Sequence, residues 1–170
     1  MGLKQEMREM FERRSAMEFN ERNSRFEDGL LEKIVNLAFA NLSRYSGKLW
    51  EISAVRAPVL LQRLYRLTND KRMQESSVVL LVADPCSGVR SGDMEGDIGL
   101  LSLSFEYAAK YYCVESFVTR DINSDAVIRE FSLGKSSPVV AAAGFGTYRE
   151  ISAAGCPRAR YVYSDIVKEL

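Results

Sequence analysis

Two short basic clusters, one near each end of the chain, are the residues best suited to bind a ligand. They consist of Arg13, Arg14 and Ser15 at one end and of Arg158 and Arg160 at the other. A guanidinium presents a planar fork of donors that matches the oxygens of a phosphate, and a serine hydroxyl adds a neutral donor. Two such clusters can hold one doubly charged phosphate between them if the fold brings them together.

Each cluster has a simpler explanation when it is taken alone. Apolar residues at helical spacing precede Arg13 and Arg14. This pair can therefore cap the carbonyl groups at the end of a helix and complement its dipole. Arginine is also common on solvated surfaces. The clusters indicate a phosphate site only in combination with the segments between them.

The absence of histidine excludes several kinds of catalysis. The 170 residues include no His, which rules out Ser–His and Cys–His nucleophile pairs and the His-based zinc motif of metalloproteases. No other side chain has an unperturbed pKa close to neutrality. An enzyme with this sequence needs another source of reactivity, and a bound organic cofactor supplies one.

Composition and charge are those of a globular protein without a bias toward nucleic acid or lipid. The 23 basic residues balance the 23 acidic ones, so no nucleic-acid or membrane partner is expected. No apolar run has the length of a membrane span, and residues 1–12 lack the apolar segment of a secretion signal. We expect a cytoplasmic protein with a single domain over residues 1–170.

Hydrophobic periodicity predicts helices that alternate with strands. Residues 77–83 form a continuous apolar run, which is typical of a strand buried on both faces. Helices are expected to start near residues 28, 58, 97 and 124, and strands to cover residues 50–55, 77–83, 115–119 and 138–143. The predicted fold class is α+β or α/β-like, with long helices around three or four central strands.

Cysteine and tyrosine residues are expected to pack rather than to react. The three cysteines are scattered and include no CxxC pair, so neither a disulfide framework nor a structural zinc site is expected. We expect Cys113 to lie in the core because it continues an apolar helical pattern. We expect three tyrosines to pack in the core or at an interface rather than to stack on nucleic-acid bases, because the chain has no excess of positive charge. These are Tyr107, Tyr111 and Tyr112.

The glycines and small residues near the end of the chain allow two interpretations. Gly144 and Gly146 match part of a dinucleotide-binding fingerprint, but Arg149 stands where the third glycine is required. They also follow the last apolar strand rather than the first, which argues against a Rossmann site. The small residues over 141–155 either admit a flat ligand or form a tight corner of the core.

The order of these segments resembles the FMN-dependent nitroreductase family. That family opens with an Arg-Arg/His-Ser-x-Arg/Lys-x-Phe motif, which here reads Arg-Arg-Ser-Ala-Met-Glu-Phe over residues 13–19. Its Asn-x-Gln-Pro-Trp segment corresponds to residues 46–50, and its final Pro-Lys/Arg-x-Arg segment to residues 157–160. A buried strand, a long helix and a glycine-containing strand end lie between them in the same order. The resemblance covers nearly the whole chain.

The resemblance implies a three-layer α+β fold with a central, mostly antiparallel sheet flanked by helices. It also implies an intertwined homodimer, embraced by a C-terminal arm from residue 161 onward, that binds FMN at the subunit boundary. Its basic clusters would bind the phosphate, and Ser46, Lys48 and the segment at 120–121 would contact the flavin ring. The cofactor-binding residues so assigned are Arg13, Arg14, Ser15, Met17, Ser46, Lys48, Arg120, Asp121, Arg158 and Arg160.

The implied activity is transfer of hydride from NADH or NADPH, through the flavin, to a nitroaromatic, quinone or similar acceptor. No catalytic side chain and no metal are expected, because the flavin N5 carries the chemistry. Met17 replaces the third cation of the opening motif, and Ser46 and Lys48 replace amide residues. These departures motivate the alternative of a non-catalytic FMN-binding or ligand-sensing dimer. A structural dimer without flavin is the remaining alternative.

Overall fold

The computed structural model describes residues 28–42, 50–84, 94–134 and 137–146 of the chain. Over these residues helices alternate with strands as expected, except that a short additional helix follows the one that begins at residue 58. The elements are α2 (Asp28–Leu42), β1 (Glu51–Val55), α3 (Pro58–Thr68), α4 (Arg72–Glu75), β2 (Val78–Ala83), α5 (Met94–Tyr111), β3 (Glu115–Thr119), α6 (Ser124–Phe131) and β4 (Val139–Gly146). The four strands form one sheet in the order β1-β2-β4-β3, and each neighbouring pair is antiparallel.

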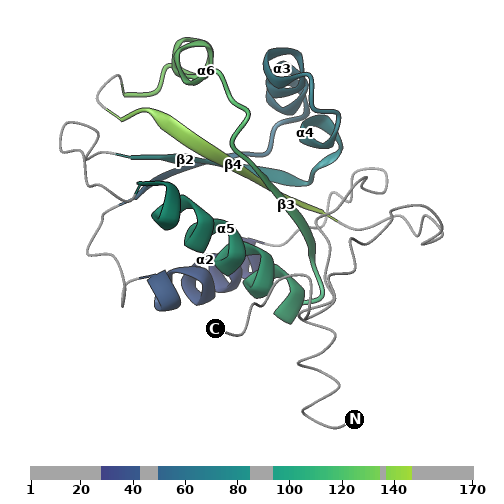
Figure 1. The fold of residues 1–170 in the computed structure, drawn as a ribbon. Helices are drawn as coiled ribbons and strands as arrows, with labels where there is room; N and C mark the ends of the chain where they lie inside the picture. Colours follow the sequence, from purple (N-terminus) through teal and green to yellow (C-terminus); the bar gives the residue numbers. More distant parts are fainter. Residues whose placement is uncertain (1–27, 43–49, 85–93, 135–136, 147–170) are drawn as a thin grey trace, which may run out of the picture.

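Helices cover both faces of this sheet (Figure 1). Helices α2 and α5 lie on one face, and α3, α4 and α6 lie on the other. Every residue of the central strand β2 is buried, and alternate residues enter the two cores. Val78, Leu80 and Val82 join the core beneath α2 and α5, whereas Val79 and Leu81 join the core beneath α3 and α6. The structure therefore confirms the predicted α+β fold with a central antiparallel sheet.

One apolar face of the long helix α5 closes the first core. Its residues Ile98, Leu101, Phe105, Ala108 and Ala109 are all buried. The Phe105 ring meets the rings of Phe39 on α2 and Phe145 on β4 edge to face, with centroids 5.9 Å apart in both pairs. Such pairs add to the free energy of simple burial, so Phe105 ties both helices to the sheet. Among the described residues, no helix has the length and apolar character needed to span a membrane.

Helix α5 differs from the prediction at both of its ends. It begins at Met94 rather than near Asp97. At its other end Cys113 has a φ of 56° and is exposed, so its predicted core position is wrong. The backbone N–H of Val114 donates to Ala109 O at 2.9 Å and that of Cys113 donates to Lys110 O at 3.0 Å. These two bonds form a Schellman cap at the end of the helix. Cys113, the residue in the left-handed conformation, is turned outward, and the next residue, Val114, is buried.

The described part of the small-residue stretch is a tight corner of the core. Residues 141–146 are all buried within β4, so the glycines lie inside the strand rather than after it. A Cβ at Gly144 would lie 2.7 Å from Phe117 Cζ and 2.7 Å from Ser76 Oγ. Phe117 is the residue paired with Gly144 across the two strands, and its ring occupies the space beside Gly144.

Replacing Gly144 with alanine is expected to destabilise the fold, because the new methyl group overlaps the Phe117 ring. The free energy of unfolding should fall by about 1–3 kcal/mol, as in other overpacked cores. The control is Gly99→Ala on α5, where an added Cβ meets no atom within 4 Å and helix propensity favours alanine by about 0.5–1 kcal/mol. Urea denaturation of both variants checks this. Equal stability of the two variants would contradict the packing described here.

Candidate functional site

Two of the ten residues assigned to the cofactor lie in the described part of the chain. These are Arg120 and Asp121, which are both exposed. The other eight lie outside the described residues: Arg13, Arg14, Ser15, Met17, Ser46, Lys48, Arg158 and Arg160. The meeting of the two basic clusters therefore stays a prediction, and the segment around Arg120 is the described part of the candidate site.

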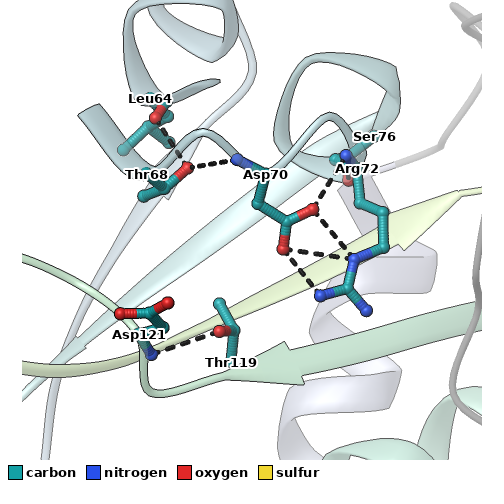
Figure 2. Close-up of polar contacts among 7 residues, drawn as sticks. All are labelled: Leu64, Thr68, Asp70, Arg72, Ser76, Thr119 and Asp121. Carbon is teal, nitrogen blue, oxygen red and sulfur yellow. Dashed lines mark hydrogen bonds and ion pairs between the residues drawn. The ribbon is translucent and has the colours of Figure 1, made fainter. Parts of the chain in front are cut away.

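Arg120 and Asp121 form the turn between β3 and α6. The backbone N–H of Asp121 donates to Thr119 Oγ1 at 3.2 Å, as Figure 2 shows. The backbone N–H of Ile122 donates to the carbonyl oxygen of Arg120 at 2.9 Å. Both hydrogen bonds lie within residues 119–122 and stabilise the turn, which presents the side chains of Arg120 and Asp121 at the surface.

The helix that follows this turn is anchored at its first residues. Asn123 Oδ1 accepts a hydrogen bond from the backbone N–H of Ala126 at 3.0 Å, which is the usual side-chain cap of a helix start. The backbone N–H of Val139 donates to Ser124 Oγ at 2.8 Å and ties the start of α6 to the start of β4. The turn is thus fixed on one side by the sheet and on the other by a capped helix.

One end of the sheet carries Arg120 and Asp121, the two described residues that the family resemblance assigned to the flavin. Because the strands are antiparallel, the ends of β2 and β3 meet the starts of β1 and β4. Asp84 follows β2 at this end; its side chain is buried, and its backbone N–H donates to Pro138 O at 3.0 Å. Trp50 directly precedes β1 here, and the segment with Ser46 and Lys48 comes just before it in the sequence. Arg120 and Asp121 follow β3 at the same end.

A charged pair that supports β3 is not predictable from the sequence. Both carboxylate oxygens of Asp70 accept hydrogen bonds from Arg72, the shortest at 2.6 Å from Nη2 (Figure 2). The guanidinium carbon of Arg72 lies 4.3 Å from the centroid of the Phe117 ring, within cation–π range. Helix α4 has only four residues, too few for a periodic pattern, and Phe117 is remote in sequence. The role of this pair is structural.

The described residues contain no group suited to a metal ion. No three His, Cys, Asp or Glu side chains come together among them. The described polar side chains at this end of the sheet include those of Trp50, Asp84, Arg120 and Asp121.

Comparison with other sequences gives no assignment. No protein-family model matches the chain, and no curated protein matches it.

Comparison with solved structures identifies the fold. A nitroreductase-like protein from Streptococcus mutans matches with a TM-score of 0.76 at 14% identity, over 99% of this chain and 100% of that one. NfrA1 from B. megaterium matches with a TM-score of 0.75 at 13% identity, over 96% of this chain and 73% of that one. A protein from Exiguobacterium sibiricum designated a nitroreductase and solved with FMN matches with a TM-score of 0.70 at 16% identity, over 96% of each chain. The chain therefore has the nitroreductase-like fold.

Proposed function

We propose that this chain is a cytoplasmic FMN-dependent oxidoreductase, with residues 1–170 as one FMN-binding domain. Hydride is taken from NADH or NADPH, and the two electrons pass on to a nitroaromatic, a quinone or a similar acceptor. The observation that carries the proposal is the nitroreductase-like fold, found over nearly the whole chain, in a sequence whose motif order indicates the same family. A match of this fold was solved with FMN, and a further one is designated an NADH oxidase.

The two basic clusters would bind the FMN phosphate in this proposal. Arg13, Arg14 and Ser15 would contact the phosphate and the ribityl chain, and Arg158 and Arg160 would contact the phosphate. A phosphate monoester carries nearly two negative charges, and bidentate guanidinium contacts to it are among the stronger hydrogen bonds in proteins.

The end of the sheet would orient the flavin ring. Arg120 and Asp121 stand there on an anchored turn, and the segment with Ser46 and Lys48 leads into the neighbouring strand β1. A cation at Lys48 would favour negative charge on the reduced ring. When bound, FMN supplies the hydride-accepting position at N5, so the chain needs no titrating catalytic side chain. This agrees with a sequence that has no histidine.

The proposal predicts that the purified protein binds FMN and turns yellow, and that NADH or NADPH bleaches it in the absence of oxygen. Replacing both Arg158 and Arg160 with glutamine should raise the FMN dissociation constant by at least about a hundredfold, because hydrogen bonds to charged groups are lost. Arg66→Gln, at an exposed position on α3, is the matched control and should bind like the unmodified protein. Flavin fluorescence titration and anaerobic absorption spectra measure both effects.

The outcomes of this experiment separate the alternatives. A protein that binds no FMN would refute the proposal. FMN that binds but is reduced by neither nicotinamide would instead favour a non-catalytic FMN-binding or ligand-sensing dimer, as the departures at Met17, Ser46 and Lys48 suggest.

A homodimer is part of the proposal, and helix α5 offers a surface for it. Leu100, Leu103 and Tyr111 are 42%, 50% and 70% exposed. At 100° per residue they share one face of the helix with the half-buried Tyr107, opposite the face that closes the core. A helix that is apolar on two faces needs partners on both. A second copy of the chain is the partner that the family resemblance implies.

Leu103→Glu is expected to weaken this dimer, because it would place a charge in the apolar contact. The dimer dissociation constant should rise by about a hundredfold or more, since the apolar contact is lost and a charge is buried. The control is Val59→Glu on α3, where the side chain is 60% exposed and lies away from α5. Light scattering coupled to size-exclusion chromatography measures the mass of each variant. A Leu103→Glu protein that stays as dimeric as the control would exclude this face from the interface.

A further inference from the structure

The chain contains the sequence Thr-x-Asp twice in the described residues, and both copies form the same hydrogen-bonded turn. Thr68 Oγ1 accepts from the backbone N–H of Asp70 at 3.3 Å, and Thr119 Oγ1 accepts from that of Asp121 at 3.2 Å. Figure 2 shows the two turns in one view. Both threonines are half-buried at the ends of regular elements, α3 and β3.

The surroundings of the two turns differ. The Thr68 hydroxyl also donates a hydrogen bond to Leu64 O at 2.9 Å. The Asp70 carboxylate accepts a hydrogen bond from the guanidinium of Arg72. The first turn is therefore part of the α3–α4 connection. In the second turn, Arg120 and Asp121 are exposed at the end of the sheet that the proposed function assigns to the flavin.

The turn at Thr119 links two anchored elements. On the side of the sheet, β3 pairs with β4 from Glu115 to Thr119, and Phe117 packs over Gly144. On the other side, α6 is held by the Asn123 cap and by the bond from Val139 to Ser124. Residues 120–122 connect the anchors, so their backbone conformation decides where Arg120 and Asp121 stand.

We propose that Thr119 is a positioning residue for the flavin site. Its hydroxyl oxygen holds the backbone N–H of Asp121, and this bond keeps Arg120 and Asp121 in the orientation that bound FMN requires. Without the bond the turn samples more conformations, and ordering it on binding costs free energy. The inference rests on the proposed function, because it concerns affinity for FMN.

The experiment replaces each threonine with valine, which keeps the shape and removes the hydroxyl. Thr119→Val should raise the FMN dissociation constant about three- to tenfold, the value of one hydrogen bond, and should speed amide hydrogen exchange at Asp121. Thr119→Ser restores the acceptor and should return the dissociation constant to that of the unmodified protein. Thr68→Val loses two comparable hydrogen bonds, so it should lower thermal stability at least as much while FMN affinity stays unchanged.

The results separate this inference from the proposal beneath it. Thr119→Val that binds FMN as tightly as the unmodified protein, or that leaves exchange at Asp121 unchanged, overturns the positioning role alone. An equal loss of FMN affinity in Thr68→Val also overturns the positioning role, since general destabilisation of the fold would then explain the effect. An unmodified protein that binds no FMN overturns the proposed function itself, and the inference with it.

Discussion

The antiparallel pairing of β2 with β4 is the interaction on which the rest of the structure depends. Both strands are central, and their side chains enter the two cores on opposite faces of the sheet. On β4, Gly144 leaves room for Phe117 of β3 and for Ser76, which occupy the space that a side chain there would take. Burial of apolar area on both faces then stabilises the helices, which have little stability by themselves.

This sheet also determines where function can reside. Antiparallel order brings the ends of β2 and β3 to the same side as the starts of β1 and β4. The connection from β3 to α6 at this side carries the charged residues Arg120 and Asp121 on a hydrogen-bonded turn. Helix α5 closes one core and still presents Leu103 and other apolar side chains outward. A ligand site at the sheet end and a subunit contact on α5 are compatible with one another.

The sequence predicted those elements whose signal is local. The strand at 115–119 and the apolar run of β2 are predicted from their own residues and match the observed strands, because the apolar pattern of a short segment indicates a strand without knowledge of its partners. Long-range contacts were not predictable: the Phe117 ring, on another strand, occupies the space beside Gly144 in β4. The prediction for Cys113 is wrong because this residue adopts the left-handed conformation of the helix cap, which turns its side chain away from the core. For the site, the family resemblance assigned Arg120 and Asp121 to the flavin, and local patterns place a connection between a strand and a helix there. Whether the clusters at Arg13 and Arg158 converge depends on the tertiary fold, which local patterns do not encode.

The most direct measurement compares the affinities of FMN and riboflavin for the unmodified protein. The two ligands share the flavin ring and the ribityl chain and differ only in the phosphate. If arginines from both ends of the chain bind this phosphate, FMN should bind at least about a hundredfold more tightly than riboflavin. Equal affinities would mean that the basic clusters do not meet at the ligand, and would contradict the account.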